Sequence, residues 1–167
     1  MKKKIVLMLT VIMLIGLAGC GKNQINIKET GTSDNNEQMV QNIYENKRTE
    51  VKQKISEIKE RLPETSAEDK GTCGSKAKWY YKDNTLIIYG EGVITENTWH
   101  KSNIVINTVV IDSGITKLGN NMFSGLGSEV GKNIENFYIA DGLEEIGSST
   151  FVNCDCLSEI VLPPSLY

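Results

Sequence analysis

The chain has 167 residues, with 18 Lys and Arg against 21 Asp and Glu, a single His and four Cys. This length predicts one domain, or one domain with a tail. The net charge of −3 offers no basic footprint for nucleic acid, and one His with few Cys disfavours a metal site with several protein ligands. We therefore expect no nucleic-acid partner, no metal and no cofactor.

The N-terminus has the pattern of an export signal. Three lysines precede an uncharged apolar run at residues 5–18. A basic start followed by such a run is typical of a secretory signal, and the run is shorter than the roughly 20 residues of a spanning helix. Its end, Leu17-Ala18-Gly19-Cys20, resembles a bacterial lipobox. The resemblance implies a diacylglycerol on Cys20 and removal of residues 1–19, which leaves 15 basic against 21 acidic residues.

A polar tether and a helix are expected next. Residues 20–36 are too polar to bury a core and predict a disordered tether. Residues 37–62 carry an apolar stripe at helical spacing, formed by Tyr44, Val51, Ile55, Ile58 and Leu62. Gln41 and Arg48 interrupt this stripe, which favours a solvated or loosely packed spacer helix over a coiled-coil stalk. Residues 63–72 are expected to be a second linker.

The pattern then changes to strands. Residues 78–82 and 86–89 are rich in aromatic and β-branched side chains, and Asp83-Asn84-Thr85 between them supplies turn residues. This arrangement predicts a β-hairpin. We expect residues 73–105 to form a β cap on the C-terminal segment.

That C-terminal segment, residues 106–167, repeats itself. Ile106–Ile111 corresponds to Ile134–Ile139 and to Leu157–Leu162, and Phe123 corresponds to Phe151. Such periodicity predicts a solenoid in which stacked units share one core. Because side chains alternate along a strand, the inward set should be Val109, Ile111, Phe137, Ile139, Ile160 and Leu162.

The predicted fold is therefore mainly β, with about two and a half repeats behind a hairpin cap. The third unit stops after its strand and turn, without the return segment of the first two. Open strand edges invite pairing with another chain. We expect self-association through this C-terminal repeat, and we expect residues 71–167 to fold without the N-terminal segments.

These repeats resemble the BspA-like leucine-rich-repeat family. The resemblance rests on Leu143–Gly147, on Phe151–Leu157 with its Asn-Cys step, and on Ile160–Leu166 with its Pro-Pro-Ser turn. Met122 and Thr150 replace the small residue that usually precedes the Phe. The resemblance implies a cell-surface interaction module, often adhesive, with no catalytic residues to transfer.

Three other motifs favour structural interpretations. Gly125–Gly131 contains a G-x-G, but no long helix follows it, as a phosphate-binding loop requires. Cys154-Asp155-Cys156 lacks the two-residue spacer of redox motifs, and Cys154 suits a small buried turn position. His100 has no recurring partner and is expected at the surface. We therefore predict no enzyme activity.

A contact surface is predicted on the outward side of the repeat strands. Thr108, Asn136 and Glu159 should form one outward row, and a parallel row should contain the residues Val110, Tyr138 and Val161. Repeat proteins bind along such sheet faces. The alternative is that the two valines are present only because valine suits strands.

The predicted function combines the tether and the repeats. The chain is expected to be an exported bacterial lipoprotein, held on the outer face of the cell membrane by lipid on Cys20. Its repeat module would bind a surface protein or glycan in an adhesion-type interaction. The alternative is an accessory or solute-capturing lipoprotein that supports a transporter or enzyme.

Overall fold

The computed structural model describes residues 12–13, 33–101, 104–124 and 131–166. Cys20, most of the predicted signal and tether, and the glycine-rich insertion at 125–130 lie outside these residues. The elements are α1 (Ser33–Arg61), β1 (Ile12–Met13), β2 (Asp69–Thr72), β3 (Lys76–Lys82), β4 (Thr85–Ile94), β5 (Thr108–Ile111), β6 (Ile115–Leu118), β7 (Asn136–Ile139), β8 (Glu145–Ile146) and β9 (Ile160–Val161). Short 3-10 helices lie at Glu64–Ser66, Thr98–Lys101 and Gly131–Asn133.

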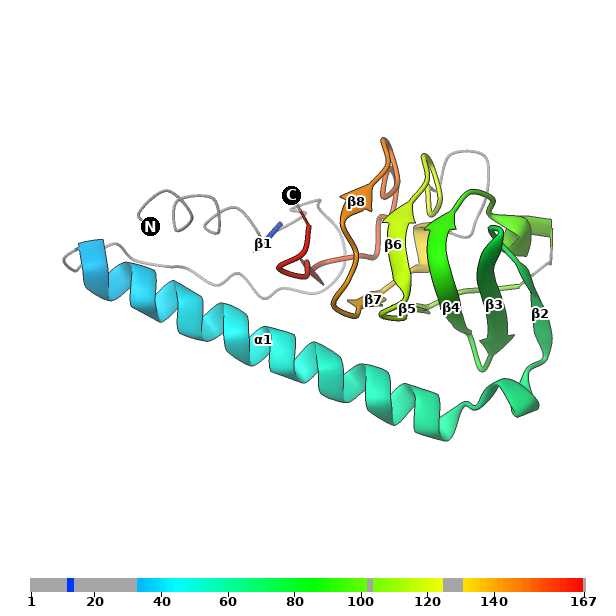
Figure 1. The fold of residues 1–167 in the computed structure, drawn as a ribbon, viewed down its shortest axis with the longest axis horizontal. Helices are drawn as coiled ribbons and strands as arrows, with labels where there is room; N and C mark the ends of the chain where they lie inside the picture. The colour runs from blue at the N-terminus through cyan, green and yellow to red at the C-terminus, as the bar shows by residue number, and fades with distance from the viewer. Residues whose placement is uncertain (1–11, 14–32, 102–103, 125–130, 167) are drawn as a thin grey trace.

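The larger sheet has the order β2-β3-β4-β5-β7. Its first three strands are antiparallel neighbours, which confirms the predicted hairpin. From β4 onward the neighbours are parallel, with Thr85, Thr108 and Asn136 in one row. The sheet therefore begins as a meander and continues as a solenoid (Figure 1).

A second ladder joins β4 to β6 and β6 to β8. Strand β4 belongs to both ladders because it bends at Gly90 and Gly92, whose φ angles are 98° and 84°. Only glycine adopts such angles without a steric cost. At the same corner, a Cβ on Gly114 would lie 1.9 Å from the carbonyl oxygen of Gly90, so successive turns stack in close backbone contact.

Strand β4, within the segment 73–105 that was predicted to be a β cap, pairs in parallel with both β5 and β6 and so continues the ladders of the repeat strands. The register aligns Leu86 with Val109. Trp99 follows the end of β4 by five residues, just as Phe123 follows the end of β6 by five residues. The two aromatic side chains therefore occupy equivalent positions. The rings of Trp99 and Phe123 stack with centroids 5.4 Å apart, and Phe151 continues the ladder 6.5 Å from Phe123.

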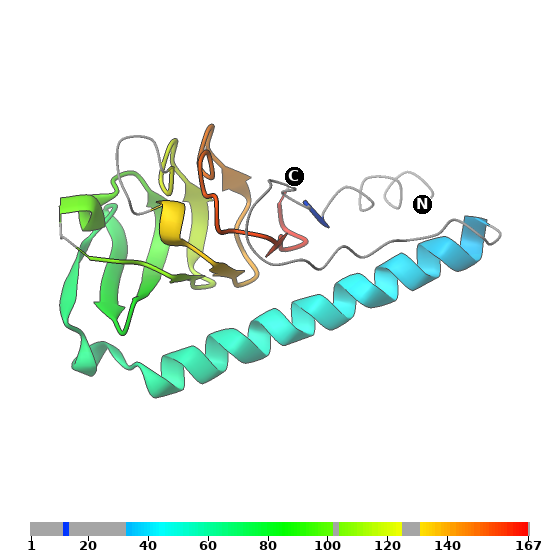
Figure 2. The same cartoon turned by 180° about the vertical axis from the view of Figure 1, so that it is seen from behind.

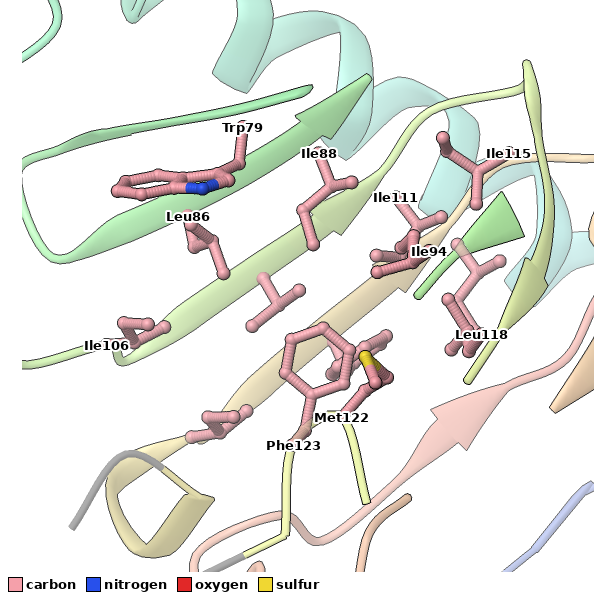
Figure 3. Packing of buried hydrophobic residues seen from close by; sticks show 14 of the residues in the cluster. Trp79, Leu86, Ile88, Ile94, Ile106, Ile111, Ile115, Leu118, Met122 and Phe123 are labelled. Carbon is pink, nitrogen blue, oxygen red and sulfur yellow. The ribbon is translucent and has the colours of Figure 1, made fainter. Parts of the chain in front are cut away.

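The core lies between the two ladders (Figure 3). Val109, Ile111 and Ile139 are fully buried there, and Phe137 and Ile160 are nearly so. Leu162 is partly buried against the same cluster. The inward set predicted from alternation is therefore confirmed.

Helix α1 packs on the opposite face of the larger sheet (Figure 2). Its buried side chains are Tyr44, Arg48, Val51, Ile55 and Ile58, and Leu62 directly after the helix continues the stripe. They cover a row that crosses five strands, formed by Tyr80, Ile87, Val110, Tyr138 and Val161. Ile87 and Val110 are fully buried. The helix is thus part of the domain rather than a solvated spacer.

Helix and sheet have matching repeat distances. The buried positions of α1 recur about every 3.6 residues, which corresponds to about 5.4 Å along the helix axis. Neighbouring strands are about 4.8 Å apart. One helical turn therefore covers roughly one strand, so a helix that crosses the strands can fill the whole row. The first turns of α1 extend past β9 (Figure 1).

The last repeat strand, β9, departs from the pattern of its predecessors. The amides of Asp112 and Ala140 donate to the carbonyls of Ile88 and Ile111, one repeat back. Pro163 occupies the next equivalent position, and proline has no N–H to donate. Strand β9 instead pairs antiparallel with β1, which lies in the segment expected to be cleaved.

The segment at 63–72 is not a plain linker, because it contains β2. The pairing aligns Gly71 with Trp79, and a Cβ on Gly71 would lie 2.8 Å from the Trp79 ring nitrogen. The strand is formed by backbone pairing and by glycine at a crowded position. Neither feature produces an alternating apolar pattern in the sequence.

Candidate binding groove

A groove opens between α1 and the first residues of strands β7 and β9. Its lining combines three glutamates and a lysine with apolar side chains: Lys47, Glu50, Val51, Glu135, Asn136, Phe137, Tyr138, Ser158, Glu159 and Val161. Helix α1 forms one wall because its stripe packs on the central row. The other wall is formed by the strand starts, which lie beside that row.

Four of the six predicted contact residues line this groove, namely Asn136, Tyr138, Glu159 and Val161. The other two, Thr108 and Val110, do not. The expectation of an open contact row is corrected for the valines, because α1 covers Val110 completely and leaves Val161 8% exposed. The exposed part of the predicted surface is the flank beside α1, where Asn136 lies.

Ion pairs hold the groove wall in place. Lys47 pairs with Glu159 across the groove. Next to it, the Arg48 guanidinium donates to the Val161 carbonyl at 3.0 Å and to the Asp141 carboxylate at 2.7 Å. Lys52 also contacts Asp141, at 2.7 Å. The helix is therefore fastened to the last two repeats by polar contacts as well as by apolar packing.

Electrostatics in the groove are set by burial and by helix charges. Burial raises the pKa of the Tyr138 hydroxyl; Lys54 opposes this effect, whereas Glu50 and Glu57 add to it. At Asp141, burial raises the pKa, but hydrogen bonds from Lys52 and Arg48 outweigh it and hold the value below 3.8. Tyr138 is thus a neutral aromatic wall at physiological pH.

The remaining candidates have structural surroundings. The Cys154 thiol is buried and donates to the Phe123 carbonyl at 3.2 Å, as expected for a small turn position. Burial raises the pKa of Cys154 to about 11 and that of Cys73 to about 12, whereas Cys156 is exposed. His100 is half-buried rather than at the surface, and burial lowers its pKa.

Two further observations concern the described residues as a whole. No three His, Cys, Asp or Glu side chains among them are grouped so as to hold a metal ion. Within the same residues, no helix combines the length and apolar character needed to cross a membrane. The three groove glutamates are therefore separate carboxylates rather than a metal cage.

Sequence reasoning missed the helix side of the groove. Lys47, Glu50 and Val51 belong to α1. Val51 was predicted as part of the apolar stripe, whereas Lys47 and Glu50 lie beside that stripe and were not predicted as groove residues. Which strand each would meet depends on how α1 is placed along the sheet. That placement is determined by long-range contacts such as those of Tyr44 with Leu162, Arg48 with Val161 and Lys59 with Asp112, which no local pattern encodes.

A match to a family model supports the assignment of the C-terminal repeats. Residues 130–167 match the model for the BspA type leucine rich repeat region (6 copies). Among solved structures, a leucine-rich repeat protein from Eubacterium ventriosum ATCC 27560 is similar, with 25% identity and a TM-score of 0.43. The similarity covers 51% of this chain and 23% of that one, so this chain spans under a quarter of that protein. No curated protein matches.

The class of protein is indicated by the matched repeats and the fold together. A mainly β sheet with one helix, and a C-terminal segment that matches BspA-type repeats, are consistent with a leucine-rich-repeat-like fold.

Proposed function

We propose that this chain is an exported bacterial lipoprotein, anchored to the outer face of the cell membrane by lipid on Cys20. Its leucine-rich-repeat module binds a protein partner in an adhesion-type interaction and has no enzymatic role. The signal pattern at residues 1–19 supports the tether, and the match over residues 130–167 supports the binding role.

The observation that carries the proposal is the groove. Seven of its ten lining residues lie within the segment that matches the family model, among them Asn136 and Glu159 from the predicted contact row, and the other three belong to α1. It is open to one side and bounded by a helix and two strands. Such a site fits a segment of a partner protein better than a small solute that must be enclosed.

Site-specific photocrosslinking in the producing cells tests the binding role. A photoreactive residue replaces Asn136 in the groove, and in a matched control it replaces Lys78, which is exposed on β3 at the far end of the sheet. We expect a discrete adduct from position 136, competed by excess unlabelled protein. Equal adducts from both positions, or none from 136, would contradict the proposal.

The tether is tested separately by Cys20→Ala. We expect this variant to remain unprocessed, or to be released from the membrane, and we expect the lipoprotein-peptidase inhibitor globomycin to block maturation of the native chain. Normal cleavage and membrane retention of the variant would exclude lipidation at Cys20.

A further inference from the structure

The charge of the groove narrows the chemistry of its occupant. Its lining has three glutamates and one lysine, a local net charge of −2. Lys47 is already paired with Glu159. In the described part of the chain no ion pair within contact distance joins Glu50 or Glu135 to a basic side chain; Lys54 pairs with Glu57, although the charge of Glu50 also acts on it. Both carboxylates are exposed and therefore accessible to a ligand.

The floor of the groove is apolar. Val51, Phe137 and Val161 are at least nine-tenths buried, and Tyr138 is half-buried beside them. A site with an apolar and aromatic floor and carboxylates at its rim matches a side chain that is apolar along its stem and cationic at its tip. Lysine and arginine side chains have this character.

Arginine fits this groove better than lysine. Its guanidinium is planar, weakly hydrated and able to stack on an aromatic ring, whereas the lysine ammonium is a compact and strongly hydrated charge. A cation over a tyrosine ring gains a further electrostatic attraction. The acidic overall charge of the chain also favours approach of a basic partner.

We propose that the groove between α1, β7 and β9 receives an arginine side chain from a basic segment of the partner protein. The stem lies over Val51 and Val161, and the guanidinium bonds the carboxylates of Glu50 and Glu135. This inference rests on the proposed binding function and specifies the partner's recognition element.

An NMR titration of the full chain in detergent tests the proposal. The probe is an acetylated, amidated pentapeptide with a central arginine between serines and glycines. We expect its addition to shift the backbone amide signals of Glu50, Asn136 and Glu159. A peptide with neutral citrulline in place of arginine should shift none of them, and a lysine peptide should bind more weakly.

Variants assign the effect to the groove. Combined Glu50→Gln and Glu135→Gln should weaken arginine-peptide binding by about tenfold or more, which corresponds to about 1.4 kcal/mol. The matched control is Glu60→Gln, because Glu60 is exposed on α1 away from the buried stripe. It should leave the affinity unchanged. Unchanged amide signals of Ile87 and Ile88 in β4, which carries none of these substitutions, would show that the variants are folded.

Three results would overturn the inference: no shift with the arginine peptide, equal binding of the citrulline peptide, or an equal loss with Glu60→Gln. These results are distinct from failure of the proposed function. A crosslink from position 136 together with no response to the arginine peptide would retain protein binding and reject arginine recognition. Loss of the crosslink would reject the proposed function itself.

Discussion

The hydroxyl of Tyr44 donates a hydrogen bond to the backbone carbonyl of Leu162, 2.9 Å away and 118 residues later in the chain. The equivalent carbonyls of Ile88 and Ile111 accept the backbone N–H of the following repeat. Tyr44 thus occupies the place of the next repeat's donor. The predicted open edge of the last unit is therefore partly covered, because Tyr44 of α1 satisfies this carbonyl and β1 pairs with β9.

We expect Tyr44→Phe to destabilise the protein by about 1 kcal/mol, because it removes this hydrogen bond without changing the shape of the ring. Denaturant unfolding monitored by circular dichroism measures the change. Met39→Leu is the control, because Met39 is 60% exposed on the same helix and should change stability by less than about 0.5 kcal/mol. Equal stability of Tyr44→Phe and the native chain would show that the carbonyl is not capped in solution.

Arg48→Ala should destabilise the domain more than Tyr44→Phe does. Arg48 is 3% exposed and bonds both Val161 and Asp141, and hydrogen bonds that involve a charged group contribute about 1.5–3 kcal/mol. Arg48→Met keeps the apolar stem and should recover part of the loss. If Ala and Met unfolded at the same denaturant concentration as the native protein, the buried guanidinium would have no role in fastening α1.

The packing of α1 predicts a large effect at its centre. Ile55 is 7% exposed over the sheet, and Ile→Ala in a core costs about 2–5 kcal/mol. Ser56→Ala, on the exposed side of the same turn, should stay within about 0.5 kcal/mol. Chemical denaturation of both variants measures the contrast. If Ile55→Ala and Ser56→Ala changed the free energy of unfolding by similarly small amounts, the interpretation of α1 as a solvated spacer helix would be favoured instead.

Stability should fall in acid through Asp141. Its pKa is lower in the folded state than its ordinary value of 3.8, so its contribution is present above the unfolded pKa and is lost as the pH falls through the folded value. We expect the urea midpoint to decline below about pH 4, and to decline less in Asp141→Asn. Identical pH profiles for the two proteins would contradict this assignment.

Thiol reactivity should separate the described cysteines. Burial raises the pKa of Cys73 to about 12 and that of Cys154 to about 11, whereas Cys156 is exposed. Because the thiolate is the reactive form, iodoacetamide at pH 8 should label Cys156 first in the folded chain. Mass spectrometry of digested samples measures the order. Rapid labelling of Cys73 would show that its site opens readily.

Sequence patterns predicted the repeat strands well because alternation and inward burial are local properties. They did not predict that β4 pairs in parallel with the repeat strands, since Gly90-Glu91-Gly92 resembles the end of a hairpin. The five-residue step from Ile94 to Trp99, equal to that from Leu118 to Phe123, was a usable signal. The strand side of the groove was predicted, because the rows of outward residues follow from alternation along the strands. The α1 side was not predicted, because it depends on contacts between distant parts of the chain. Arg48 interrupted the apolar stripe in sequence, but its polar partners lie on another part of the chain.

Native-state amide hydrogen exchange tests the central claim, that α1 is an integral part of the repeat domain and forms one wall of its groove. Residues that open only on global unfolding share one free energy of exchange. We predict that amides of Val51–Ile58 in α1 and Val110–Ile111 in β5 exchange with the same free energy, and that Ile55→Ala lowers both together. Fast exchange throughout α1 while β5 stays protected would contradict this claim.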